Sequence, residues 1–295
     1  MALPQLHTAT YELELPSTGK KVKYRPFLVK EQKVLMMAQE SEDDKQIEQA
    51  FASIISECTF QKLEPYKLPL FDIEFIFLKL RGKSVGEKVN ISVLCPDDEK
   101  TRADVEINLE DVGVLMNVDH TNEIELTKDI KMFMKYPTLS DMSGFSNEGQ
   151  VADIFEMIKN CVLEIHNGTE VFNAIDITSK ELDDFIGQMS TENFEQVNAF
   201  FTTMPKLQHI VKVKNPKTKK NRRSYNRRYA KFFRLALSHD SLENYYKTNF
   251  GMMQHHNYSL TELENMVPWE REIYIGLLME FLKEEREKIE EEKRK

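Results

Sequence analysis

Cysteine is scarce in this 295-residue sequence, and long apolar runs are missing. The three cysteines, Cys58, Cys95 and Cys161, lie far apart. An odd and sparse set, without an N-terminal charged and apolar leader, is typical of the reducing cytosol rather than of a secreted disulfide scaffold. No apolar run approaches the roughly 20 residues that a membrane helix needs. The sequence therefore predicts a soluble intracellular protein without membrane contact.

The motifs of common enzymes are also missing. The sequence has no GxxxxGK[ST], GxGxxG, GxSxG or HExxH. Cys95 lacks the second cysteine, two to four residues on, that a zinc knuckle requires. His255 and His256 are adjacent, so on a helix they would point about 100° apart, which does not suit a shared metal ion. We therefore expect a binding or assembly protein with no catalytic residue, no metal and no cofactor.

Charge is distributed unevenly along the chain. The whole sequence is acidic, with 40 basic and 49 acidic residues, yet residues 212–233 carry ten Lys and Arg and no acid. One interpretation is a linker or seam between two parts of the chain. The alternative is a nucleic-acid-binding adaptor that uses the basic and aromatic run 212–234 for phosphate contact and base stacking. The candidate basic contacts are Arg222, Arg223, Arg227 and Arg228. We favour the linker, because an isolated basic run is more often solvated, and expect no nucleic acid partner.

The first half of the chain combines strand and helix patterns. Apolar and charged residues alternate on both sides of Pro16 to Gly19. The charged residues before this turn are glutamates and those after it are mainly lysines, which predicts a hairpin with cross-strand charge pairing. A second alternating pair, Lys88 to Leu94 and Arg102 to Leu109, predicts another hairpin. Between the hairpins, residues 31–40, 47–58 and 70–82 have helical spacing, and Cys58 lies on the apolar stripe of the second helix, where we expect it to be buried.

From Val151 on, the pattern becomes helical. An apolar stripe predicts one helix that extends to Ile165, and Ser259 with Glu262 forms a capping box ahead of another helix. The members of the stripe are Val151, Ile154, Phe155, Ile158, Val162 and Ile165. The expected fold class is α+β, with antiparallel β-hairpins and packed helices in the N-terminal half and a mostly helical C-terminal half.

The last helix carries the clearest candidate for a binding site. Pro268 occupies a position in the first turn of this helix, and large apolar residues then recur at every fourth position. These candidate partner-binding residues are Trp269, Ile273, Leu277 and Phe281. Large aromatic residues are common anchors of a helix in the groove of a partner. The alternative is that the stripe packs on the helices expected within residues 229–250, and the pattern leaves both interpretations open.

Three separated stretches resemble, in order, the baseplate hub proteins of T-even-type bacteriophages. They are LPSTGKKVKYRPFLVKEQKVL, FDIEFIFLKLRGKSVGE and FFTTMPKLQH. The resemblance covers roughly residues 1–214. After the basic run, MMQHHNYSLTELENMVPWEREIYIGLLMEFLKEE is similar to a smaller protein of the same phages, described as a catalyst of hub assembly.

The resemblance implies a function and a domain organisation. We expect a hub-like α+β domain in residues 1–214, a basic linker or seam in residues 215–228, and a helical tail similar to an assembly factor or tail assembly chaperone in residues 229–295. It implies a non-enzymatic phage tail protein that acts in baseplate hub assembly, as a hub component or as a chaperone for hub or tape-measure proteins. Its place would be the host cytoplasm during assembly, or the baseplate of the virion.

Overall fold

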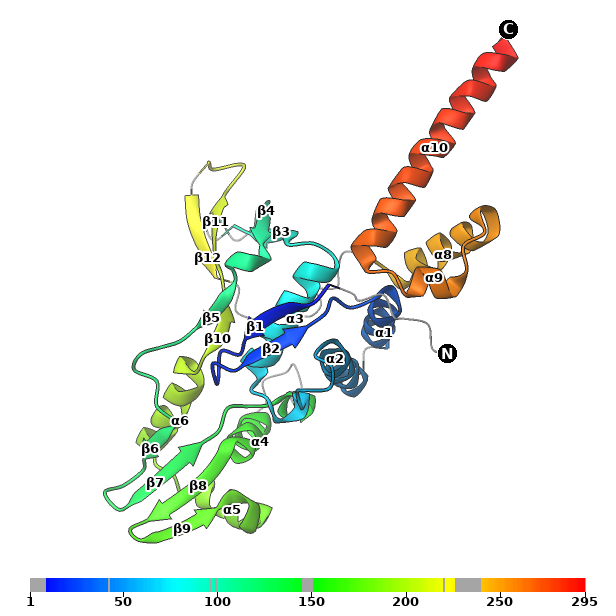
Figure 1. Ribbon diagram of the computed structural model, residues 1–295. Helices are drawn as coiled ribbons and strands as arrows, with labels where there is room; N and C mark the ends of the chain where they lie inside the picture. Colours follow the sequence, from blue (N-terminus) through cyan, green and yellow to red (C-terminus); the bar gives the residue numbers. More distant parts are fainter. Residues whose placement is uncertain are drawn as a thin grey trace, which may run out of the picture.

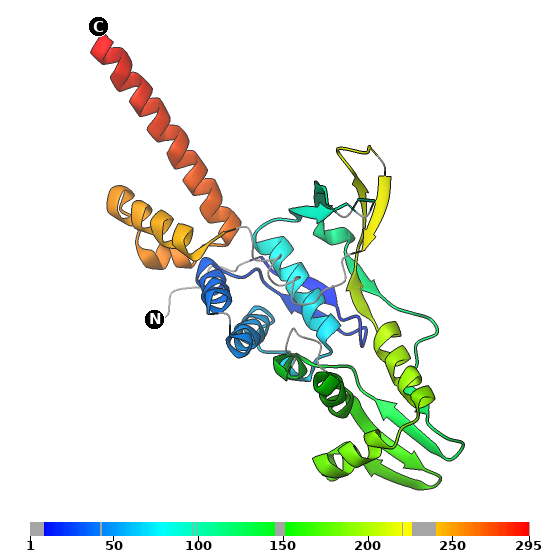
Figure 2. The same ribbon diagram turned by 180° about the vertical axis from the view of Figure 1, so that it is seen from behind.

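The computed structural model describes residues 9–41, 43–95, 97–98, 100–144, 151–219, 221–225 and 240–294. Its architecture is α+β, as predicted (Figure 1). We call the described residues up to 225 the head, which contains the strands, and residues 240–294 the tail, which is helical. Four clusters of buried apolar side chains stabilise the molecule. Seen from either side, the final helix of the tail projects away from the rest of the molecule (Figures 1 and 2).

The first cluster joins the N-terminal hairpin to three helices. β1 (Tyr11–Glu14) pairs with β2 (Lys21–Tyr24), and Glu12 lies opposite Lys23, which is the register that the alternating charges favour. The helices are α1 (Val29–Glu40), α2 (Asp44–Cys58) and α3 (Leu70–Ser84), with a short 3₁₀ helix at Pro65–Lys67. α3 is apolar on nearly all sides because it lies between the first and second clusters, to which it contributes Phe77 and Leu78.

The second cluster is built from short antiparallel strand pairs. The pairs are β3 (Lys88–Leu94) with β4 (Arg102–Asn108), β5 (Gly113–Leu115) with β10 (Lys206–Gln208), and β11 (Ile210–Lys214) with β12 (Asn221–Tyr225), and a 3₁₀ helix spans Leu109–Asp111. Val213 of β11 is buried among side chains of β3 and β4. The start of the basic run is therefore part of a hairpin that packs on the head.

The third cluster lies beneath a four-stranded antiparallel sheet of order β6-β7-β8-β9. Its strands are β6 (Glu123–Glu125), β7 (Ile130–Met134), β8 (Val162–Asn167) and β9 (Glu170–Asn173). The helices α4 (Val151–Cys161), α5 (Ser179–Gly187) and α6 (Thr191–Thr203) supply the other apolar side chains, and 3₁₀ turns span Leu139–Gly144 and Ala174–Asp176. This sheet forms the end of the molecule far from the projecting tail helix (Figure 1).

The predicted helix from Val151 to Ile165 is wrong in its last part. α4 ends at Cys161, and the next six residues form β8. Ile165 lies opposite Met132 of β7 and Phe172 of β9, so its apolar side chain is buried by strand partners rather than by helix neighbours. Gly168 turns the chain from β8 into β9 with a φ of +60°, which glycine adopts without steric cost.

The tail consists of α8 (Leu242–His256), α9 (Leu260–Glu264) and α10 (Pro268–Arg294). α8 ends at Asn257, in the left-handed conformation with a φ of 61°, and α9 begins with the predicted capping box of Ser259 and Glu262. Among the described residues, no helix is both long and apolar enough to cross a membrane.

The clusters of the head allow a test of the proposed first domain. The first and third clusters lie entirely before residue 214, and the second needs no residue beyond Val213. We expect a fragment of residues 1–214 to unfold in one cooperative thermal transition, measured by circular dichroism. If the fragment is molten or insoluble while the full chain is well folded, the tail is part of the core and the proposed boundary fails.

Candidate partner-binding site

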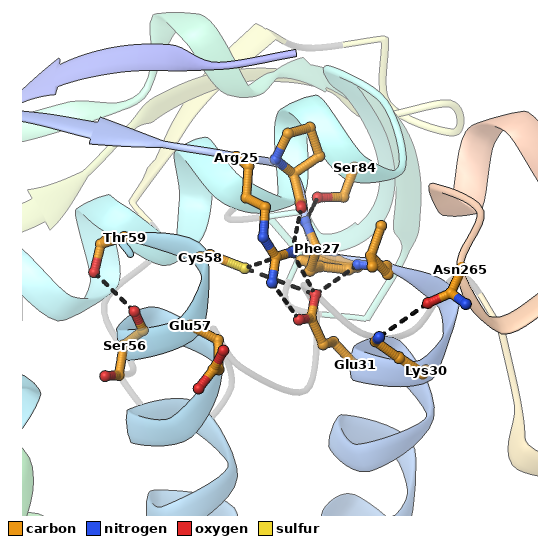
Figure 3. A network of polar contacts seen from close by, with 12 residues as sticks. Arg25, Phe27, Lys30, Glu31, Ser56, Glu57, Cys58, Thr59, Ser84 and Asn265 are labelled. Carbon is orange, nitrogen blue, oxygen red and sulfur yellow. Dashed lines mark hydrogen bonds and ion pairs between the residues drawn. The ribbon is translucent and has the colours of Figure 1, made fainter. Parts of the chain in front are cut away.

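The first turn of α1 is fixed by a buried ion pair (Figure 3). Arg25, at the end of β2, donates two hydrogen bonds to the Glu31 carboxylate, with Nη2–Oε1 and Nη1–Oε2 distances of 2.6 and 2.9 Å. Glu31 Oε2 also accepts a hydrogen bond of 2.7 Å from the backbone N–H of Leu28. The hydrogen bond to Glu31 raises the pKa of Arg25. The pair therefore holds the start of α1 against the end of the hairpin.

Cys58 lies beside this ion pair and is fully buried, as predicted. Its Sγ is 3.7 Å from Arg25 Nη1 and 3.8 Å from Glu31 Oε2 (Figure 3). Burial raises the pKa of the thiol far above its ordinary value, and the Glu31 carboxylate acts in the same direction. A thiol held in its neutral form is a poor nucleophile, so Cys58 has a packing role.

The tail docks on the exposed side of α1. The backbone N–H of Val29 donates a 2.9 Å hydrogen bond to the carbonyl of Met266. Lys30 Nζ donates a hydrogen bond of 2.9 Å to Asn265 (Figure 3). One turn later, Lys33 forms a 2.9 Å ion pair with Glu264. This ion pair holds the pKa of Glu264 below its ordinary value. Since α1 is itself fixed by Arg25 and Glu31, these contacts give the tail a defined position on the head.

A second buried ion pair fixes the base of α10. Arg271 is 1% exposed and pairs with Asp240 at 3.0 Å. Its guanidinium also lies 3.5 Å from Asn249 Oδ1 and over the ring of Tyr245, at 5.6 Å from the ring centroid. These contacts join the first turn of α10 to α8 and leave the rest of α10 to project outward (Figure 2).

The structure places the four predicted partner-binding residues in two settings. Trp269 is 43% exposed and lines a pocket of about 220 Å³ at the base of α10, together with Gln32 of α1 and Val85 after α3. Ile273, Leu277 and Phe281 lie on the projecting part of α10 and are 52%, 57% and 55% exposed. A row of large apolar side chains with this much exposed surface is typical of a contact site.

A second row of exposed apolar side chains lies on α8. Tyr246, Phe250 and Met253 follow one another at helical spacing, and all three are exposed. Sequence reasoning did not single them out, although the spacing is readable in the sequence. The spacing alone does not separate this row from the buried side of the helix, because the buried residues Tyr245 and Met252 continue the same apolar pattern.

The basic run reaches the surface at the turn of the β11–β12 hairpin. Buried Asn215 donates hydrogen bonds of 2.8 Å to Asp97 and 3.0 Å to Asp98, which lie in the turn between β3 and β4. The exposed residues Lys214 and Lys217 flank this contact. The candidate contacts Arg222 and Arg223 fall on β12, whereas Arg227 and Arg228 lie outside the described residues. The turn is thus held against the β3–β4 turn, and it carries exposed lysines.

The next feature is the arrangement of potential metal ligands. Within the part of the chain that the structure describes, no cluster of three or more His, Cys, Asp or Glu side chains is placed to hold a metal ion. His255 and His256, at the end of α8, have ring centroids 6.4 Å apart with an interplanar angle of 63°. The two rings do not converge on one point.

Comparison with known families accounts for nearly the whole chain. The family described as T4 bacteriophage base plate protein matches residues 8–234, which include the basic run. The C-terminal domain of the baseplate hub assembly protein Gp51 matches residues 236–280, which include α8, α9 and the first half of α10. No curated protein and no solved structure matches the chain. The two matches follow the predicted order of segments, and the chain belongs to the T4 bacteriophage base plate protein family, with a tail that matches the Gp51 hub assembly domain.

Proposed function

We propose that this chain is a non-enzymatic assembly factor of the phage baseplate hub, which holds a hub or tape-measure protein while the baseplate forms. The observation that carries the proposal is the row of exposed apolar residues along α10. Trp269, Ile273, Leu277 and Phe281 would serve as the partner contact. The match of the tail to a hub assembly domain supports this role.

The arrangement of the two parts suits such a role. The head supplies a folded platform, and α1 holds the tail on it through Met266, Asn265 and Glu264. The 27 residues of α10 give a helix of roughly 40 Å, and Arg271 fixes its first turn through Asp240. The exposed apolar residues Ile273, Leu277 and Phe281 beyond this turn are available for a partner.

Co-expression tests this proposal. The full chain would be produced with the tail tube, hub and tape-measure proteins, and the co-purifying partner would be identified. We expect a hub or tape-measure protein to be retained. Retention of none of them would reject the proposal. Such a factor would act either as a chaperone or as a hub component. Quantifying the chain in finished tails separates the two, because a chaperone would be absent from the virion and a hub component would be present at fixed stoichiometry.

A nucleic-acid adaptor is the second candidate, and the exposed lysines at the β11–β12 turn favour it. We predict that DNA contributes little. Changing Arg222, Arg223, Arg227 and Arg228 to Gln should leave partner retention within about twofold of the unmodified chain, because these residues lie on or after the hairpin and not on α10. A gel-shift titration of single- and double-stranded DNA provides the comparison. Tight binding near physiological salt that the four changes abolish would favour the adaptor instead.

A further inference from the structure

The exposed rows on α8 and α10 lie on the same side of the tail. Arg271, in the first turn of α10, pairs with Asp240, just before α8 begins, and also lies 3.5 Å from Asn249 in the middle of α8. Both helices run outward from this contact (Figure 1). Each residue of an α-helix turns the chain by about 100° around the axis. When this rotation is counted from Asn249 on α8 and from Arg271 on α10, the exposed rows of the two helices point to the same side of the helix pair.

We call this surface the α8–α10 face. Its members are Tyr246, Phe250 and Met253 on α8 and Tyr274, Leu277 and Phe281 on α10, and they are between 40% and 65% exposed. Three of the six are on a helix that sequence reasoning did not associate with binding. The face is therefore wider than the single stripe on α10, and it presents two rows of large side chains, one on each helix.

The surroundings of the α8–α10 face are acidic. Residues 240–294 contain 13 acidic and seven basic side chains. One of the basic side chains, Arg271, is buried against Asp240 and does not face solvent. Beyond Phe281, the same side of α10 continues into the exposed residues Glu284, Glu285 and Lys288, so carboxylates outnumber basic groups there. A partner that covers the apolar rows would place its own polar residues next to this negative charge.

The type of secondary structure also restricts the partner. The described residues of the tail are helices joined by short turns, so they offer no free strand edge for β-sheet addition. Two rows of side chains on neighbouring helices instead receive the apolar stripe of a third helix, which packs between them.

We propose that the α8–α10 face binds an amphipathic helix of a partner protein, with an apolar stripe of large aliphatic or aromatic residues flanked by Lys and Arg. This proposal rests on the function proposed above, since it specifies which kind of segment the tail would hold. The apolar stripe supplies the contact area, and the flanking basic residues select the partner because they meet Glu284 and Glu285.

Binding of two designed peptides to the full chain tests the chemistry directly. The probe is a fluorescein-labelled helix of about 18 residues made of leucine and lysine, with the leucines on one face, and its counterpart carries glutamate in place of lysine. Fluorescence anisotropy should give a Kd for the lysine peptide at least about tenfold lower than for the glutamate peptide, and the difference should shrink in high salt.

Matched variants locate the binding site. Phe250→Ser on α8 and Leu277→Ser on α10 should each weaken the lysine peptide by roughly tenfold or more. Ile175→Ser is the control, because Ile175 is 93% exposed in the head and lies outside the face. Circular dichroism of each variant checks that the tail remains helical. Equal binding of both peptides, or binding that neither Phe250→Ser nor Leu277→Ser weakens, would overturn the proposal.

Self-association is a further outcome that would overturn it. If the chain sediments as a dimer at micromolar concentration and Phe250→Ser makes it monomeric, a second copy covers the face. Failure of the peptide experiment can also be separated from failure of the proposed function. A hub or tape-measure protein that is retained by the full chain, without any preference for the lysine peptide, would reject the helix proposal alone.

Discussion

Replacing Glu31 with alanine is expected to lower the free energy of unfolding of the head by about 3 kcal/mol. The change leaves the Arg25 guanidinium without its carboxylate in a mostly buried position, where the two side chains are 17% and 11% exposed. It also removes the acceptor of the Leu28 N–H. A buried charge that has lost its partner costs far more than an exposed ion pair is worth. Urea denaturation followed by circular dichroism measures the effect.

Two further variants provide a comparison for the loss of stability in Glu31→Ala. Glu31→Gln keeps the shape and one acceptor, so its stability should fall between that of the unmodified chain and that of Glu31→Ala. Glu12→Ala removes an ion pair with Lys21 at 3.6 Å, in which the side chains are 49% and 68% exposed, and should cost no more than about 0.5 kcal/mol. If Glu31→Ala and Glu12→Ala unfold at the same urea concentration, the ion pair does not fix α1.

The sequence predicted the elements whose signals are local. The hairpin of β1 and β2 was predicted from alternating charges around a turn, and its register puts Glu12 opposite Lys23. The helix α9 was predicted from Ser259 and Glu262, three residues apart, which form the capping box that the structure contains. In each case the residues that carry the signal also make the contact. The local sequence is therefore enough to predict the element.

The strand β8 could not be predicted in the same way, because its partner is distant. The three-residue spacing of Val162 and Ile165 fits a helix, whereas a regular strand would place them on opposite faces. Both residues nevertheless pair with β7, at Met134 and Met132, which precede α4 in the sequence, and the register shifts between Phe133 and Met134. A local signal was nevertheless present at Asn167 and Gly168, a pair common in hairpin turns. The apolar stripe of α4 outweighed it.

The candidate site was predicted only in part, for a related reason. Regular spacing identified the row on α10, but exposure depends on which neighbours cover a helix, and spacing does not reveal them. Tyr245 and Tyr246 are adjacent in sequence, yet Tyr245 is 1% exposed and Tyr246 is 52% exposed. The contacts of α8 with α1 and with Arg271 decide this difference. The pairing of Asn215 with Asp97 and Asp98 is likewise a long-range contact that charge counting does not show.

The combined change of Trp269 and Phe281 to alanine is expected to weaken retention of the hub or tape-measure partner by about 4 kcal/mol. Each true hot spot contributes about 2 kcal/mol or more, or roughly 30-fold in Kd. Both side chains are about half exposed, so a partner can still bury a large aromatic surface on each of them. Retention by the full chain, quantified against a titrated partner, measures the loss.

The two single variants separate partner binding from stability. Phe281 lies on the projecting part of α10, so Phe281→Ala should weaken partner binding without changing the melting temperature. Trp269 lines the pocket beside Gln32 and Val85, so Trp269→Ala is expected to lower the stability of the tail slightly as well. Ile175→Ala, in the head, should change neither property. If the double variant unfolds the tail, or leaves both its stability and hub assembly unchanged, the row on α10 is not a partner site.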